Sequence, residues 1–262
     1  KNTSISDVET FVEDVIEIFG KRHLFESKLL GEKRELLIHL PQGYPKANVK
    51  YPVLYVLDGN SHFKHAVLAA ENLHQGDKMP QTIIVGIPNN TGKRGRDSYD
   101  ERDNFFAFIK GEVMTYIDSN YNNSGRNILF GHSAMGLVTM SIFANHNSLF
   151  DQYIASSSAV DHTDTELFSQ LKKLFIQNKL INKSIYFSVG EKAREIQGFT
   201  DGSIYMSKLF TEKSPETLSW KYALIPGQNH GTVPYLAMFQ GLSSVFSDYE
   251  APALTSYQEF EK

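Results

Sequence analysis

Short apolar runs alternate with longer segments of helical periodicity along most of the chain. The runs are rich in β-branched and aromatic residues, which is typical of strands that are covered on both faces. They lie at Pro52–Asp58, Thr82–Ile87, Asn127–Gly131, Ser184–Val189 and Trp220–Ile225. Strands that alternate with helices predict βαβ units. We therefore expect an α/β fold whose central sheet is mostly parallel and flanked by helices.

Apolar positions three and four residues apart predict the helices between these strands. One covers Phe105–Ile117, and another begins just after Ser133. Further helices are expected near Glu166–Ile176, Ile204–Phe210 and Val233–Phe246. Each of these segments separates two apolar runs, as the crossover helix of a βαβ unit does.

Two features precede the first of the apolar runs. Apolar residues recur at helical spacing over residues 8–19, and Gly20 follows in the position of a C-cap, so an extra helix is expected within residues 1–20. Two strands around a turn are then expected near Arg22–Leu29 and Glu35–Leu40. This opening segment adds to the alternating pattern without changing the predicted fold class.

Composition narrows the possible functions. No repeat or linker divides the 262 residues, so we expect a single α/β domain over residues 1–262. A net charge of −4 argues against nucleic acid as a partner. The chain has no cysteine, which excludes disulfides, thiolate metal sites and cysteine nucleophiles. No apolar run approaches the roughly 18 residues of a membrane span.

The stretch Asn127–Leu137 carries the most specific motif. An apolar strand runs into Gly131-His132-Ser133, and an apolar helix follows. A nucleophile elbow requires this context, because the serine sits on a sharp turn with the helix N-terminus facing the developing oxyanion. Ser133 is therefore the candidate nucleophile. Met135 stands where the G-x-S-x-G pattern has its second glycine, so its side chain must press on the preceding strand or point elsewhere.

A candidate general base follows the last predicted strand. His230 lies in the polar turn Pro226–Gly231, on a loop at the carboxyl edge of the sheet, where catalytic groups of open α/β sheets collect. It also follows Ser133 in the chain, which fits the α/β-hydrolase order of serine, acid and histidine. Of the nine histidines, His230 alone meets these conditions. It is the candidate that takes the proton from the serine hydroxyl.

The acid of a triad should lie between serine and histidine, on a loop that follows a strand. The penultimate predicted strand and the loop after it satisfy this requirement. Glu191 is closest to the strand end and is the first choice, Glu195 is the alternative and Asp201 is third. Asp161 and Asp164 are weaker candidates.

Two backbone N–H groups are needed to form an oxyanion hole. The residue after the nucleophile supplies one, and this is Ala134. The turn after an early strand supplies the other. Asp58-Gly59-Asn60 is a turn sequence in that place, so Asn60 is the expected second donor.

Four further residues are candidates for contact with a substrate. Tyr99 and Tyr235 lie on or beside loops at the catalytic edge, and His132 precedes the nucleophile. His62 follows the oxyanion turn and has a second histidine three residues later. No third ligand is spaced to complete a zinc site, so no metal is expected. The three serines at 156–158 are interpreted as the end of a buried strand rather than as a second nucleophile.

The motifs together resemble those of a known family. The segment Tyr51–Gly59, a Gly-His-Ser elbow, a late strand followed by Gly-Glu and a final Asn-His-Gly occur in that order. This arrangement is similar to the serine esterase family of α/β hydrolases that contains esterase D-like and enterochelin esterase-like hydrolases. The similarity spans roughly Glu26–Phe246. It implies an α/β-hydrolase fold, no cofactor, and hydrolysis of carboxylic or thiol esters of a small molecule.

By position, the resemblance implies that Ser133 is the nucleophile, His230 the base, Asn60 and Ala134 the oxyanion donors, and a carboxylate of the acid loop the orienting acid. Two departures leave other functions open. Met135 replaces a small residue, and the acid loop lacks a carboxylate at the third position after its glycine. An acyltransferase on the same scaffold and a non-catalytic binding module with a hydrolase fold are the alternatives.

Overall fold

The computed structural model describes residues 17–89, 91–178, 180–191 and 195–251. Within these ranges eight strands form one open sheet in the order β1-β2-β4-β3-β5-β6-β7-β8. β2 pairs antiparallel with β1 and with β4, and all other neighbours are parallel, so the predicted mostly parallel sheet is confirmed. The strands are β1 (Lys21–Ser27), β2 (Glu32–His39), β3 (Tyr51–Leu57), β4 (Ile83–Ile87), β5 (Asn123–His132), β6 (Gln152–Ser156), β7 (Lys183–Gly190) and β8 (Leu218–Ile225).

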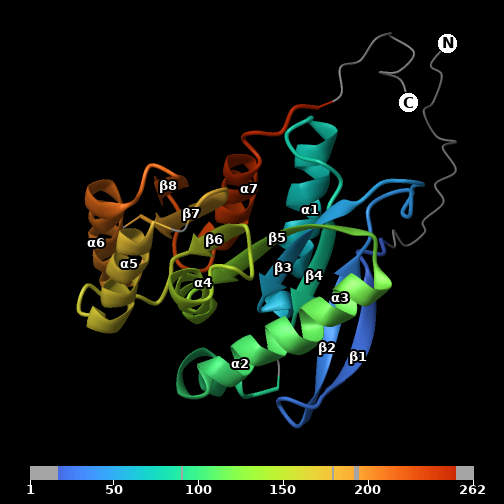
Figure 1. Ribbon diagram of the computed structural model, residues 1–262, viewed down its shortest axis with the longest axis horizontal. Helices are drawn as coiled ribbons and strands as arrows, with labels where there is room; N and C mark the ends of the chain where they lie inside the picture. The colour runs from blue at the N-terminus through green and yellow to red at the C-terminus, as the bar shows by residue number, and fades with distance from the viewer. Residues whose placement is uncertain (1–16, 90, 179, 192–194, 252–262) are drawn as a thin grey trace, which may run out of the picture.

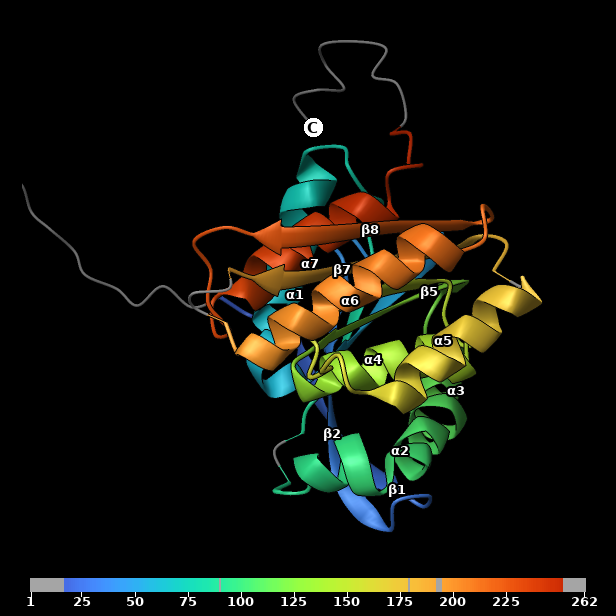
Figure 2. The same ribbon diagram turned by 90° about the vertical axis from the view of Figure 1, so that its left-hand side faces the viewer.

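Helices cover both faces of this sheet (Figures 1 and 2). On one face, α1 (Gly59–Gln75) and α7 (Val233–Val245) pack against Leu54 and Val56 of β3. Alternate residues of the same strand, such as Val53, point to the opposite face, because side chains alternate along a strand. The helices on that opposite face are α2 (Arg102–Phe108), α3 (Thr115–Asn120), α4 (Ala134–Asn145), α5 (Thr165–Gln177) and α6 (Gln197–Lys213).

The central strands β3, β4 and β6 are buried at every position. Their continuous apolar runs are thus explained by helices on both faces. The expected helix over Phe105–Ile117 is instead α2 and α3 joined by the π-helical segment η2 (Ile109–Met114). η2 contains Gly111, a poor helix former, and together the three segments form one rod in Figure 1.

The expected helix at residues 8–19 lies largely outside the described part of the chain, and residues 17–20 are not helical. None of the described helices combines the length and apolar character needed to cross a bilayer. Among the residues that the structure describes, no group of three histidine, aspartate or glutamate side chains is arranged to bind a metal ion.

The parallel strands bring distant loops to one edge of the sheet. His132 at the end of β5 is level with Ser156 of β6, and Ser156 is level with Ser188 of β7. Gly190 of β7 is in turn level with Ile225 of β8. The residues that follow β5, β6, β7 and β8 therefore meet at the carboxyl edge, where the candidate catalytic residues are expected.

Candidate active site

Ser133 forms a sharp turn between β5 and α4. Its backbone has φ 59° and ψ −124°, a conformation that non-glycine residues rarely adopt. Its N–H donates to the carbonyl of Ser156 over 3.0 Å, and its own carbonyl accepts from the N–H of Ala159 over 2.9 Å. These bonds hold the strained serine at the end of the neighbouring strand β6, in the geometry of a nucleophile elbow.

Two glycines allow the elbow to close. A Cβ at Gly131 would overlap the carbonyl oxygen of Met135 and the hydroxyl of Thr139. A Cβ at Gly136 would lie 2.7 Å from the hydroxyl oxygen of Ser158. Gly131 therefore lets β5 approach α4, and Gly136 lets α4 approach the chain at the end of β6.

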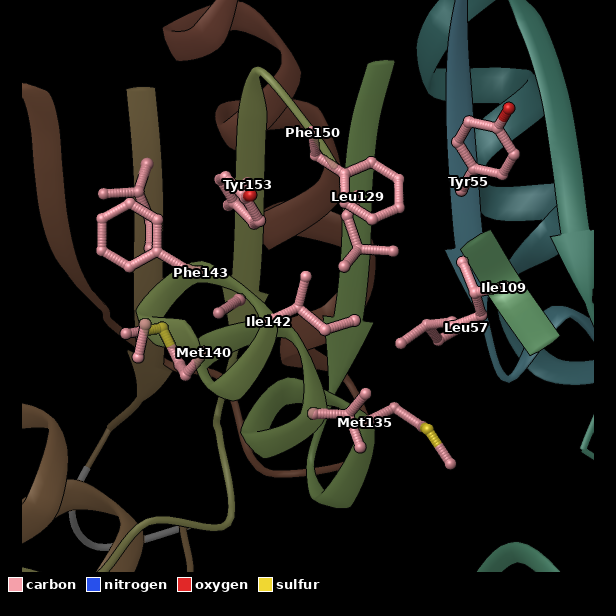
Figure 3. Close-up of a cluster of buried hydrophobic side chains, with 14 of the residues drawn as sticks. Tyr55, Leu57, Ile109, Leu129, Met135, Met140, Ile142, Phe143, Phe150 and Tyr153 are labelled. Atoms are coloured by element: carbon pink, nitrogen blue, oxygen red, sulfur yellow. The ribbon is translucent and has the colours of Figure 1, made fainter. Parts of the chain in front are cut away.

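Met135 does not press on the strand that precedes the elbow. Its side chain is fully buried and extends from α4 toward the side of the core that holds Leu57 and Ile109 (Figure 3). Its carbonyl oxygen, rather than its side chain, makes the close approach to Gly131. The departure from the G-x-S-x-G pattern is accommodated because the methionine fills the hydrophobic core.

Three side chains from separate loops form a hydrogen-bond chain at this edge. The Oγ of Ser133 lies 3.0 Å from Nε2 of His230, and Nδ1 of His230 lies 2.7 Å from Oε1 of Glu195. When Nδ1 carries the proton and donates to the carboxylate, Nε2 is free to accept the hydrogen bond of the serine hydroxyl. This tautomer is the one that a general base for Ser133 requires.

The carboxylate of Glu195 is inaccessible to solvent, with 0% of its side chain exposed. Its Oε1 also accepts from the N–H of Ile196 over 2.8 Å, and its Oε2 accepts from the hydroxyl of Ser157 over 2.6 Å. Burial by itself raises the pKa of the carboxyl group, but the hydrogen bonds from His230, Ser157 and Ile196 outweigh it. The pKa of Glu195 consequently lies below its ordinary value, and the group is an anion at neutral pH.

The structure places the alternative acid, Glu195, at His230, and not the first choice, Glu191. The N–H of Glu191 donates to the carbonyl of Gln228, and its Oε2 accepts from the N–H of Gly227 over 2.9 Å. A residue that directly follows β7 is thus tied to the adjacent loop after β8. Glu195, four residues further along the chain, is the carboxylate that reaches the imidazole.

Aromatic rings enclose the imidazole of His230. The ring of His132 lies 4.5 Å from it, centre to centre, and the ring of Phe199 lies 5.5 Å from it. His62 packs edge-on against His132 at 5.4 Å. His132 and His62 are each only 8% exposed, so they lie behind the hydrogen-bond chain and not at an open mouth. Sequence reasoning missed Phe199, which belongs to no motif.

The two inner histidines are uncharged at neutral pH. Burial, followed by the neighbouring His230 and His62, lowers the pKa of His132 to about 3. Burial, followed by His65 and Arg94, lowers the pKa of His62 to about 4. Neutral rings beside His230 add no positive charge that would oppose its protonation during a reaction.

The expected oxyanion donors begin two helices at the same edge. Ala134 is the first residue of α4 and Asn60 the second residue of α1, and the first N–H groups of a helix have no partner within it. Asp58 precedes α1 with φ 51°, and its carboxylate accepts hydrogen bonds of 2.7–3.1 Å from Arg94. The side chain of Asn60 accepts from the N–H of Asn89 over 3.0 Å. The turn Asp58–Asn60 is therefore held at both of its ends, at Asp58 by Arg94 and at Asn60 by Asn89.

A cavity of about 360 Å³ lies between α4, α5 and the loop that follows β6, and its lining includes neither Ser133 nor His230. Leu137 and Ala159 line it, and the N–H groups of both donate to the carbonyl of Ser133. Tyr99, which is 53% exposed, and Arg102 form another part of the wall. Tyr235 contacts His65 instead, with ring centres 5.4 Å apart. A larger cavity of about 590 Å³ lies at the amino ends of β6 and β7, away from these residues.

Comparisons with known proteins identify the family and the fold. The profile of the family described as Putative esterase matches residues 27–234. An IroE-like serine hydrolase from Shewanella oneidensis has a similar structure, with a TM-score of 0.80 and 25% identity over 92% of this chain and 84% of that one. The BES protein from Bacillus cereus has the same fold, with a TM-score of 0.79 and 23% identity over 91% of this chain and 99% of that one.

A curated relative is similar in sequence over a shorter stretch. Ferri-bacillibactin esterase BesA of Bacillus subtilis is 27% identical over 147 residues, which are 44% of this chain and 50% of that protein. The family match extends over most of the chain, from β1 to the start of α7. The chain therefore belongs to the Putative esterase family, and it is a carboxylic ester hydrolase with an α/β-hydrolase fold.

Proposed function

We propose that the chain hydrolyses its ester substrate through an acyl-enzyme on Ser133, with His230 as the general base and Glu195 as the orienting acid. The observation that supports this proposal is the continuous hydrogen-bond chain from Glu195 Oε1 through His230 to Ser133 Oγ, with distances of 2.7 and 3.0 Å. The strained elbow supports it further, because strain of this kind persists at functional sites.

In the first half-reaction, Nε2 of His230 takes the hydroxyl proton of Ser133 as Oγ attacks the ester carbonyl carbon. The carbonyl π bond breaks, and its electron pair becomes the oxyanion. The N–H groups of Ala134 and Asn60 stabilise that charge. The tetrahedral intermediate collapses, the bond to the leaving oxygen breaks, and His230 returns its proton to the departing alcohol.

In the second half-reaction, water replaces the alcohol. His230 takes a proton from the water as the water oxygen attacks the acyl carbon. When the second intermediate collapses, the bond between the acyl carbon and Oγ breaks, Oγ of Ser133 receives the proton from His230, and the carboxylic acid is released. The Glu195 anion stabilises the imidazolium in both steps, because it lies at hydrogen-bond distance and is shielded from solvent. A thiol ester would react by the same steps, with a thiol as the leaving group.

The cavity lined by Leu137 and Ala159, whose N–H groups bond to the carbonyl of Ser133, is the proposed binding site for one part of the substrate. Tyr99 and Arg102 provide hydrogen-bond donors there, and Leu137 provides apolar contact. We therefore expect a substrate with polar groups near the scissile ester. Siderophore esters belong in the first substrate panel, because a ferri-bacillibactin esterase is among the relatives.

The experiment that tests the proposal is intact-mass analysis after exposure to a fluorophosphonate, on the wild type and on Ser133→Ala. We expect one adduct on the wild type and none on the variant, together with loss of nearly all ester turnover. Absence of an adduct on folded wild-type protein would favour a non-catalytic binding module. Product analysis with a competing alcohol separates hydrolysis from acyl transfer.

A further inference from the structure

Ser157 occupies an unusual position at the end of β6. It is fully buried, and its φ of 39° lies in the left-handed region, which costs free energy for a residue other than glycine. Its N–H donates to the carbonyl of Ser188 over 2.7 Å, which ties it to β7. Backbone strain of this kind persists only where surrounding contacts hold the residue in place, and the side chain of Ser157 makes such contacts.

The hydroxyl of Ser157 lies between the end of β7 and the acid loop. Its Oγ accepts from the N–H of Gly190 over 3.4 Å and donates to Oε2 of Glu195 over 2.6 Å. Gly190 keeps this space open, because a Cβ there would lie 3.0 Å from the same Oε2 and 2.9 Å from the carbonyl oxygen of Gln228. Ser157 and Gly190 together form the seat of the carboxylate.

This seat fixes the rotation of the Glu195 carboxylate. The terminal torsion of a glutamate side chain is broad, so an acid on a loop needs donors on both oxygens to hold one orientation. Oε1 contacts His230 and the N–H of Ile196, whereas Oε2 contacts Ser157. Without the hydroxyl of Ser157, Oε2 would be buried without that donor, and the direction of Oε1 toward His230 would be less well defined.

We infer that Ser157 is a positioning residue of the proposed reaction, which holds Glu195 in the orientation and charge state that His230 requires. This inference rests on the function proposed above and adds a fourth residue to it. Ser157 does not contact the substrate. It acts through Glu195.

The perturbation is Ser157→Ala, with Ser156→Ala as its matched control. Both serines are fully buried neighbours, but the hydroxyl of Ser156 has no partner among the described residues. We expect Ser157→Ala to lower kcat about tenfold and to change KM less than about twofold, because it removes one charge-assisted hydrogen bond. Ser156→Ala should leave both constants within about twofold of the wild type.

A double-mutant cycle distinguishes positioning from general structural damage. The probe is p-nitrophenyl acetate, and the second substitution is Glu195→Ala, which removes the group that Ser157 would orient. If Ser157 acts through the carboxylate, Ser157→Ala costs less than about twofold in the Glu195→Ala background. An undiminished tenfold loss there, or a Ser157→Ala enzyme that matches Ser156→Ala, would overturn the inference.

A titration independent of turnover completes the test. Carbon-13 NMR of labelled glutamate carboxyls gives the pKa of Glu195, with the signal assigned by its absence in Glu195→Gln. Removal of a donor to the anion should raise this pKa by about one unit in Ser157→Ala and leave it unchanged in Ser156→Ala. If the wild type showed no turnover, the proposed function would fail alone, while this titration would still decide the role of Ser157.

Discussion

Replacement of Glu195 by glutamine tests the assignment of the acid most directly. Glutamine has nearly the same shape, and its amide oxygen can accept from His230 Nδ1 and from the N–H of Ile196 in place of Oε1. The hydroxyl of Ser157 can rotate to accept from the new amide nitrogen. The substitution therefore removes the negative charge with little change of packing, at a side chain that is closed to solvent.

The expected loss follows from the geometry. Proton transfer from Ser133 makes His230 a cation, whose charge centre lies about 4 Å from that of the carboxylate, and two such charges attract by about 4 kcal/mol at an effective dielectric constant of about 20. Loss of that attraction in the transition state corresponds to a fall in kcat of about a thousandfold. KM should change little, because Glu195 lies behind the imidazole.

The assay is kcat and KM on an activated ester, with Glu191→Gln as the control. Glu191 is on the same loop, but it contacts the backbone of Gly227 and not His230. We expect its variant to stay within about tenfold of the wild type, since an exposed hydrogen bond contributes little. Equal losses in both variants, or a Glu195→Gln enzyme that keeps more than a tenth of its turnover, would refute the assignment.

Three further predictions concern the frame of the site. Gly131→Ala should lower the free energy of unfolding by about 3 kcal/mol or more, because the added Cβ overlaps the backbone of α4. Gly95 faces open space, so Gly95→Ala should not lower it, and thermal unfolding compares the two variants. Glu32 has a pKa of about 2, lowered from 4.5 by Arg96 despite burial, so Glu32→Gln should cost roughly 3 kcal/mol at pH 7. The cost should shrink below pH 4.5 and vanish near pH 2, which urea unfolding measures; a pH-independent cost would contradict it. Arg94→Gln should lower kcat about tenfold with KM nearly unchanged, because it loosens the oxyanion turn; a rise in KM alone would indicate substrate contact.

Most of the fold could be predicted because strands and crossover helices leave separate periodicities in the chain. Each predicted apolar run is a strand, and the strong elbow motif places Ser133 at the end of β5. The sequence defines helix boundaries poorly where the apolar periodicity is weak. α6, for example, begins at Gln197, whereas the pattern predicts a start near Ile204. The polar and glycine residues of its first turns give no apolar periodicity from which the start could be predicted.

The acid of the hydrogen-bond chain illustrates what local sequence does not specify. Glu191 and Glu195 are both glutamates of one loop after one strand, and no motif separates them. Their roles diverge through contacts with distant residues, since Glu191 bonds to the loop after β8 and Glu195 to His230 and Ser157. The same holds for Met135, whose effect on the elbow depends on a space in the core.

The sequence by itself determined the alternating α/β pattern and the sharp strand-to-helix turn at Ser133, because these depend on short-range periodicity and on residues close together in the chain. Only the tertiary structure decided which carboxylate meets His230, which serine supports it and where Met135 packs. Those outcomes depend on hydrogen bonds and contacts between segments far apart in the chain, such as Ser157 and Glu195, which are 38 residues apart. Contacts of that kind depend on which strands become neighbours in the sheet and on where their loops meet, and the residue pattern within one segment does not specify either.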